Sequence, residues 1–412
     1  MQLASKIHEA EDFNAVQELY HSSGWTDGLP IVPPTAEAVR ACLEWAMFPP
    51  EQQIGVEPVR ERPITAEKLA VNAVMAGCLP MHFPVVIAAV TAMLSQDFLL
   101  HGATASTGGC AVLLVLNGPI RQELSANSTF NVLGSSDRAT MVIGRALRLI
   151  LINVLDVRPG GIDRSTIGHP GKISYCIAED EEDSSWLSLA EQNDIPKEAS
   201  AVTVLAAGAP RQIMNEWTTE PKEILETFAA EIRANMRHYS IWPGNYAIIV
   251  PQQLRRHLQK AEWSKRDVAE FIFERARIHR REWADVGKGA VVRDRGDTVY
   301  PAMESPDQLL VIAAGGPAGG FGAVIPPFTV INLWRSGAGR NGLYVHVAGA
   351  LGLALGAWVL IALVGEPAQW IALAIGVLAY QPTFFAGTRL NGVAVGTVIA
   401  LGSAPIVTGI LD

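Results

Sequence analysis

The segment AGCLPMHFP places a thiol and an imidazole four residues apart. A cysteine beside a histidine can act as a nucleophile, because the imidazole accepts the proton of the thiol. We therefore predict that Cys78 and His82 carry the chemistry. Two other interpretations stay open: a metal corner completed by Cys110 or Cys176, and a cysteine that is simply buried at the end of a helix. The sequence identifies neither a metal nor a cofactor.

Three arginines lie on one side of a helix that we expect within NSTFNVLGSSDRATMVIGRALRLILINV, beginning near residue 136 or 137. At roughly 100° per residue, Arg138, Arg145 and Arg148 fall within about 80° of one another. The rest of the helix is almost wholly apolar, so these cations need partners. Either acids of the protein, such as Glu179 or Glu181, pair with them, or they bind an anionic substrate.

Other polar side chains extend this predicted substrate site. SGWTDGLPIVPPT supplies an aromatic ring and an acid, although that acid can equally close an Asx-turn. Two asparagines precede the arginine helix, and GHPGKISYC follows it with a lysine, on a segment whose alternation predicts a strand. We predict that a small anionic molecule contacts Trp25, Asp27, Asn127, Asn131, Arg138, Arg145 and Lys172.

Three further stretches carry polar or glycine-rich patterns. HGATASTGGC concentrates hydroxyls beside two glycines, which can surround a polar ligand or form a plain turn. LLVIAAGGPAGGFG is followed by AVIPP instead of a helix, so it fails the context test for a dinucleotide- or phosphate-binding loop. Close approach of its backbone to a ligand stays open. The acidic run AEDEED is expected to be a solvated loop.

The elements that position these residues indicate an α/β fold with a layered sheet. AVLLVLNGP, AVTVLAAGAP, NYAIIVP and DQLLVIAAGGP are typical of buried strands that end at Gly or Pro, and TAEKLAVNAVMAGCL and FPVVIAAVTAML of helices. Thr65 is the expected N-cap of the first of these helices. We find no internal repeat in the sequence. We predict one part over residues 1–185, which holds the candidate site, and a second α/β part over 186–330.

Charge and cysteine content limit the class of protein. The formal net charge is −9 at neutral pH, which disfavours a nucleic-acid partner, because such proteins usually present a basic face. Four cysteines lie far apart without a CxxC pair, and the N-terminal residues are too acidic for a signal peptide. We therefore expect residues 1–330 to lie in the cytoplasm.

The C-terminal residues have a different composition. From residue 343 onward the only charged side chains are Glu366, Arg389 and Asp412. A linker over 331–342 is followed by apolar stretches at 343–364, 370–386 and 392–411, about the length that crosses a bilayer as helices. A buried helical hairpin of a soluble domain is the alternative. Arg335 and Arg340 precede the first stretch, so the positive-inside rule keeps the N-terminal part cytoplasmic.

The segment YQPTFFAGTRLNGVAVGTVIALGSAPIVTGIL resembles the EamA, or drug/metabolite transporter, family. The resemblance covers about the last seventy residues. It implies membrane helices that pack closely through Gly and Ala. The family is a bundle of about ten helices built from two repeats, so three spans would be either an anchor or a transporter fragment.

A second resemblance covers roughly residues 20–328. SGWTDGLPIVPPT, NGPIRQEL, IGRALRLI and GHPGKISYCIAEDEE are similar to an uncharacterised bacterial family. That family is associated with small redox-type proteins that bear a Cys-Gly-Ser-Cys (CGSC) or selenocysteine-Gly-Ser-Cys (UGSC) motif, which the resemblance implies as partners. The family pattern ends soon after a GGP loop, and this chain departs from it after about Phe328.

Together these observations predict a membrane-attached protein with a cytoplasmic α/β part. We expect an enzyme or enzyme subunit that acts on a small anionic molecule, with thiol or redox chemistry. The alternative is an incomplete membrane transport protein whose N-terminal part is regulatory.

Overall fold

The computed structural model describes residues 1–95, 98–182, 184–239, 243–292 and 298–328. Of these, residues 1–55 and 63–328 belong to one compact unit, and residues 56–62 fall outside it. The linker predicted over 331–342 and the spans predicted between 343 and 412 lie outside the described residues. Within the described ranges, no helix is both long and apolar enough to cross a membrane.

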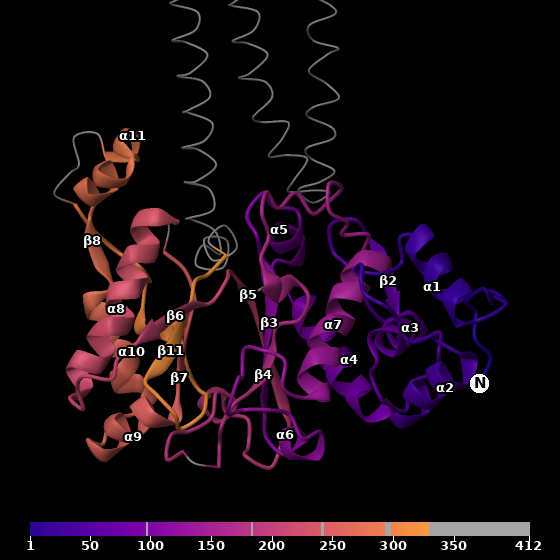
Figure 1. The fold of residues 1–412 in the computed structure, drawn as a ribbon, viewed down its shortest axis with the longest axis horizontal. Helices are drawn as coiled ribbons and strands as arrows, with labels where there is room; N and C mark the ends of the chain where they lie inside the picture. The colour runs from indigo at the N-terminus through magenta and orange to yellow at the C-terminus, as the bar shows by residue number, and fades with distance from the viewer. Residues whose placement is uncertain (96–97, 183, 240–242, 293–297, 329–412) are drawn as a thin grey trace, which may run out of the picture. The chain divides into compact units, whose positions relative to one another are not determined.

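Helices of the N-terminal part cover one face of the first sheet (Figure 1). Apolar side chains of α3, α4 and α7, such as Leu69, Val86 and Ile143, pack against Leu114 and Leu116 of that sheet. The helices of this part are α1 (Phe13–Ser22), α2 (Ala36–Trp45), α3 (Ala66–Ala76), α4 (Phe83–Met93), α5 (Leu100–Thr104), α6 (Ile120–Glu123) and α7 (Arg138–Asn153).

Two sheets meet in the middle of the compact unit. The first has the order β4-β3-β5 and the second the order β10-β7-β11-β6. Leu113 and Val115 share a buried apolar cluster with Ile249 and Ile312, so the sheets pack face to face. The strands are β3 (Ala111–Asn117), β4 (Cys176–Ala178), β5 (Ala201–Ala207), β6 (Arg211–Met214), β7 (Tyr246–Val250), β10 (Leu309–Ala313) and β11 (Phe321–Ile325).

A second layer of helices covers the outer face of the second sheet (Figure 1). Phe228 and Ile272 of these helices pack against Ile248 and Val311 of the strands. The layer consists of α8 (Pro221–His238), α9 (Gln252–Lys260) and α10 (Lys265–Arg275). The remaining elements are β1 (Gln53–Glu57), β2 (Arg62–Thr65), β8 (Arg277–His279), α11 (Gly289–Val292) and β9 (Val299–Pro301). The compact unit thus has four layers, α/β/β/α.

The order of elements repeats between the two sheets. In the first, β3 pairs in parallel with β4, which follows after helices, and antiparallel with β5, which comes next. In the second, β7 pairs in parallel with β10, which also follows after helices, and antiparallel with β11. The sequence itself shows no repeat, because the two sheets share a pattern of strand pairing and not a pattern of residues.

Local sequence signals account for the elements that were predicted. Asp137 caps α7 by accepting a hydrogen bond from the Thr140 N–H at 2.8 Å, and Thr65 caps α3 as expected. Inside α7, a Cβ on Gly144 would lie 2.2 Å from Ser174 Oγ. Gly144 therefore allows α7 to approach the segment that leads into β4. The strand predicted to begin at Lys172 is wrong at that residue, because Lys172 ends the 3-10 helix Pro170–Lys172 and the strand covers Cys176–Ala178.

The prediction that the acidic run after β4 is a solvated loop is wrong at its first residues. Glu179 is 1% and Asp180 2% exposed, and the Glu181 side chain is 8% exposed. These residues follow β4 at the end where β3, β7 and β10 also finish. The segment that follows β4 lies between the two sheets, where the Asp180 N–H bonds the Ala313 carbonyl of β10. Both sheets therefore enclose these carboxylates.

Basic side chains neutralise the charge of these buried acids. They come from two halves of the compact unit, the first sheet with its helices and the second sheet with its helices. From the first half, Arg121 bonds the Glu179 carbonyl at 2.8 Å and forms an ion pair with Glu181 at 2.9 Å. From the second half, Arg255 bonds Asp180 at 2.7 Å, and Lys265 Nζ lies 2.5 Å from Glu179 Oε1. Buried carboxylates are tolerated only when they are paired in this way.

We expect the Lys265–Glu179 pair to be essential for stability. Lys265→Met should lower the free energy of unfolding by about 3–5 kcal/mol in urea titrations, because Glu179 loses its cationic partner in a buried site. Arg266→Met is the matched control and should change the free energy of unfolding little, because the ion pairs of the neighbouring Arg266 with described residues are exposed. Equal losses in the two variants would contradict this assignment.

Candidate functional site

Cys78 and His82 have separate backbone partners. Cys78 Sγ contacts the Val142 carbonyl at 3.5 Å, and burial raises the pKa of its thiol. His82 Nδ1 accepts a hydrogen bond from the Leu79 N–H at 3.0 Å, and burial lowers the pKa of its ring. The thiol and the imidazole are thus both held in their neutral forms. Their catalytic role stays a prediction that these contacts do not support.

Asp27 and Arg145 bind each other. Nε and Nη2 of Arg145 donate to the two carboxylate oxygens of Asp27, each at 2.8 Å, and Nη2 also reaches the Pro30 carbonyl. Asp27 Oδ1 accepts from the Leu29 N–H at 3.3 Å as well, which is the Asx-turn alternative. The carbonyl of Trp25 accepts a bond from Asn153. Arg145 therefore ties α7 to the segment over residues 25–30.

The other basic candidates also have protein partners. Arg138 donates to the Gly77 carbonyl at 2.8 Å. Arg148 lies 3.4 Å from Asp163, and Lys172 Nζ reaches both carboxylate oxygens of Asp163 at 2.8 and 2.7 Å. The acids that pair with this helix and with Lys172 are thus Asp27 and Asp163, and not the Glu179 or Glu181 that we had suggested.

Asn127 and Asn131 shape the loop before α7. Asn127 donates to the Phe130 carbonyl and to Ser136 Oγ at 2.8 and 2.7 Å. Asn131 has a left-handed backbone, with φ of 57°, and donates to the Ser135 carbonyl. Asn131 also lines a cavity beside this loop. The substrate-binding roles of both asparagines stay predictions.

A cavity of about 310 Å³ is lined by residues of two segments, HGATASTGGC and the segment that leads into GHPGKISYC. Residues 107–109 precede β3, and residues 166–169 precede β4. The Thr166 N–H bonds the Thr107 carbonyl at 2.9 Å, and a Cβ on Gly109 would lie 2.9 Å from the Gly168 Cα, so this approach requires glycine. We call the cavity the donor pocket. Its lining is Thr107, Gly108, Gly109, Thr166, Ile167, Gly168, His169, Gly208, Ala209, Arg211, Asn235, Tyr239 and Pro326.

His169 enters the donor pocket as a neutral ring. Its Nδ1 accepts a hydrogen bond from the Gly171 N–H at 3.2 Å, which leaves the proton of the neutral ring on Nε2. Burial lowers its pKa most strongly, hydrogen bonding with the Ala207 backbone acts in the opposite direction, and the charge of Lys172 lowers the pKa to a lesser degree. Nε2 is buried and lies near the Ala207 backbone, but this contact falls short of normal hydrogen-bond geometry, and Nε2 has no other partner among the described residues.

Asn235 supplies a second donor from α8. The residue is fully buried, and its Oδ1 accepts a hydrogen bond from the Tyr246 hydroxyl at 2.7 Å. Its Nδ2 is buried without a hydrogen-bond partner among the described residues. An unpaired buried amide costs free energy, so a ligand oxygen in the donor pocket would remove an existing penalty.

Arg211 and Tyr239 complete the set of donors. Arg211 lies at the start of β6, and among the described residues it forms an ion pair with Glu231 that spans 3.4 Å and is partly exposed. Tyr239 follows α8, and burial raises the pKa of its hydroxyl, which keeps it protonated. No Asp or Glu occurs among the described residues that line the donor pocket. The lining therefore offers hydrogen bonds and one positive charge, which suits an anion or a carbonyl oxygen.

Sequence reasoning missed Asn235, Arg211 and Tyr239 as site residues. His169 stood in a stretch that we had singled out, but not among the predicted contacts. Asn235 and Tyr239 lie on and after a helix with a regular amphipathic pattern, where an asparagine carries no distinguishing signal. The packing of α8 against β6 and β11 of the second sheet brings them to the Thr107–Gly109 loop.

The described part of the chain holds no group of three or more His, Cys, Asp or Glu side chains arranged to bind a metal ion. Cys110 lies next to the donor pocket, and burial raises the pKa of its thiol to about 12. Cys42, Cys78 and Cys176 are likewise buried and free. Reactive thiolates are normally accessible and near positive charge, so the geometry favours the donor pocket over any of these thiols as the reactive region.

The Asp27–Arg145 pair gives a pH-dependent test. Burial would raise the pKa of Asp27, but the hydrogen bond and charge of Arg145 hold it below its usual value. The pair therefore contributes stability above about pH 4, and this is lost as the pH falls through the folded-state pKa. Arg145→Met should lower the free energy of unfolding by about 3 kcal/mol at pH 7, with a smaller difference from wild type near pH 3.

Urea unfolding at both pH values checks this expectation, with the exposed Arg277→Met as control. A loss of stability that is equal at the two pH values, or absent at pH 7, would show that the pair does not hold α7 to residues 25–30.

Comparisons with known proteins match a small part of the chain. No protein-family description matches it, and no solved structure matches it. Among curated proteins, 39 residues, or 10% of this chain, are 54% identical to the protein named "Uncharacterized transporter YwfM" of Bacillus subtilis (strain 168). The match spans 13% of that protein's length. The chain thus has a partial similarity to a transporter.

Proposed function

We propose that this protein binds a small anionic molecule in the donor pocket. The observation that carries the proposal is the buried Nδ2 of Asn235, which has no partner among the described residues. It lines the cavity with the buried Nε2 of His169 and the partly exposed Arg211. Three donors and no acid match a carboxylate or another oxyanion, for which a guanidinium is the strongest partner.

The pocket also supports stabilisation of an oxyanion, which is the basis for an enzymatic role. A neutral His169 with its proton on Nε2 donates a hydrogen bond to a ligand oxygen on which negative charge develops, and it keeps that proton. Tyr239 is a second protonated group in the same lining. This role requires no thiol, unlike the chemistry that we expected from the sequence. A redox protein with a CGSC or UGSC motif, implied by resemblance alone, stays a predicted partner.

The alternative function is membrane transport. It is favoured by one observation, the 39 residues that are 54% identical to an uncharacterized transporter. In this alternative the α/β part regulates a membrane segment, and the donor pocket binds the regulating anion. The two functions therefore share the pocket but differ in what the membrane segment does, which is an anchor for the enzyme and part of a transport path in the alternative.

Anion binding can be measured by thermal shift on the full chain with succinate, sulfate and phosphate. An anion at one hundred times its Kd should raise the free energy of unfolding by about 2.7 kcal/mol in wild type. Arg211→Met should abolish most of this gain without lowering the anion-free melting temperature, because the Arg211 side chain is 41% exposed. Arg266→Met, an exposed arginine of α10, should respond like wild type. If none of the anions stabilises wild type, or Arg266→Met loses the response equally, anion binding in this pocket is rejected.

Fractionation tests attachment to a membrane, and an uptake assay separates the two functions. If the chain resides in a membrane, the full-length protein should pellet with membranes and resist a carbonate wash, while a chain ending at Phe328 should stay in the supernatant. Release of the full-length protein by carbonate would exclude transport. Uptake of labelled succinate by vesicles that hold the full chain, absent in empty vesicles, would favour transport over an enzyme.

A further inference from the structure

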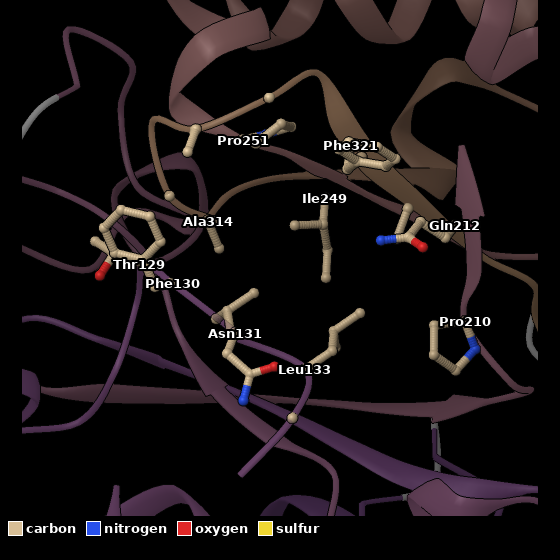
Figure 2. Close-up of a pocket in the computed structure, with 18 residues that line it drawn as sticks. Thr129, Phe130, Asn131, Leu133, Pro210, Gln212, Ile249, Pro251, Ala314 and Phe321 are labelled. Atoms are coloured by element: carbon tan, nitrogen blue, oxygen red, sulfur yellow. The ribbon is translucent and has the colours of Figure 1, made fainter. Parts of the chain in front are cut away.

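A second cavity, of about 330 Å³, lies at the loop before α7 and the glycine-rich loop between β10 and β11 (Figure 2). We call it the ring pocket. It shares no lining residue with the donor pocket. On β6, Arg211 lines the donor pocket and the next residue, Gln212, lines the ring pocket. Successive side chains of a strand point to opposite faces, so the two cavities are separate sites.

The lining of the ring pocket carries no formal charge. It consists of Thr129, Phe130, Asn131, Val132, Leu133, Gly134, Pro210, Gln212, Ile249, Pro251, Ala314, Gly315, Gly316, Ala318, Gly319, Phe321, Gly322 and Ala323. A cavity without a compensating charge disfavours an ionised ligand, because desolvating an ion costs several kcal/mol. The occupant it suits is therefore uncharged in the part that enters.

Two phenylalanine rings stand at opposite ends of this cavity, with Ile249 between them (Figure 2). Phe130 is 59% and Phe321 46% exposed, which is high for aromatic side chains. A Cβ on Gly316 would lie 2.7 Å from the Phe130 ring, and a Cβ on Gly319 would lie 3.0 Å from Phe321. Each ring thus lies against the backbone of a glycine, and about half of its surface stays exposed.

Polar contacts in the ring pocket come from two amide side chains. Gln212 is exposed, and its side-chain amide makes no hydrogen bond within the described part of the chain, while its backbone belongs to the β6–β11 ladder. Asn131 donates from Nδ2 to the Ser135 carbonyl. An amide presents both a donor and an acceptor, so the lining can pair with a ligand edge that carries both. The glycine-rich loop offers less, because the N–H groups of Gly319 and Gly320 already bond Gln253 and Glu216.

From the open aromatic faces, the uncharged lining and the free amide of Gln212, we infer that the ring pocket binds an uncharged heteroaromatic ring with donors and acceptors on its edge. Stacking on Phe130 or Phe321 supplies the apolar contact, and Gln212 reads the edge of the ring. The glycine-rich loop between β10 and β11 lacks the following helix of a phosphate-binding loop. In this assignment its glycines support the rings of Phe130 and Phe321.

The test measures binding of adenine and lumichrome, two uncharged heteroaromatic rings, to the full chain by ligand-observed NMR. At least one should bind wild type, and benzoate, which is charged, should bind more weakly. Phe130→Ala should weaken binding about fivefold or more, as loss of a stacking partner does. Phe13→Ala is the matched control, because Phe13 on α1 is also 59% exposed, and it should bind like wild type.

Gln212→Ala provides a second variant that does not depend on an aromatic side chain, and it should reduce affinity for both rings. Arg211→Met should leave ring binding unchanged, so failure of the anion site and failure of the ring site can be told apart. Affinity of wild type weaker than about 1 mM for both rings, or equal weakening by Phe130→Ala and Phe13→Ala, would overturn the inference.

Discussion

The fold depends on the enclosure of two adjacent carboxylates, Glu179 and Asp180, at the carboxyl end of β4. Asn117 of β3 donates to Glu179 at 2.7 Å, and the Asp180 N–H donates to the Ala313 carbonyl of β10 at 2.6 Å. Lys265 and Arg255 reach the two acids from the other half of the chain. Because neither carboxylate can be left unpaired at this burial, the strand ends of both sheets are held in one arrangement.

That constraint acts on the opposite end of the sheets through their face-to-face packing. There the ends of β5 and β11 meet, as the Gly208 N–H bonds the Pro326 carbonyl at 2.9 Å. The donor pocket opens beside this junction, with His169 from the segment before β4 and Asn235 from α8. Charge compensation is thus concentrated at one end of the strands, and unpaired donors at the other. The ion pairs at the carboxyl end of β4 stabilise the fold, so the fold tolerates unpaired hydrogen-bond donors at the opposite end of the strands.

Patterns confined to one element were predictable from the sequence. The buried strands β3, β5, β7 and β10, the helices α3, α4 and α7, and the Thr65 cap all follow from hydrophobic runs and local hydrogen bonds. The need of Arg145 for a partner was also predictable, because its helix is otherwise apolar. Its partner Asp27 was not, since 118 residues separate the two.

Features that depend on two halves meeting could not be predicted from the sequence. The burial of Glu179 requires Lys265, which is 86 residues away at the first turn of α10, where a lysine is ordinarily exposed. Asn235 is unremarkable on its helix and becomes a candidate only when its amide is found enclosed without a partner. The similarity to a transporter covers too little of the chain to supply this information.

The most direct test of the donor pocket is a crystal structure of the protein soaked in selenate, a small oxyanion whose selenium is located by anomalous scattering. We predict an anomalous peak inside the cavity, with selenate oxygens about 3 Å from Asn235 Nδ2 and His169 Nε2. Peaks confined to exposed lysines and arginines, with the Asn235 amide paired to another protein group, would contradict the account.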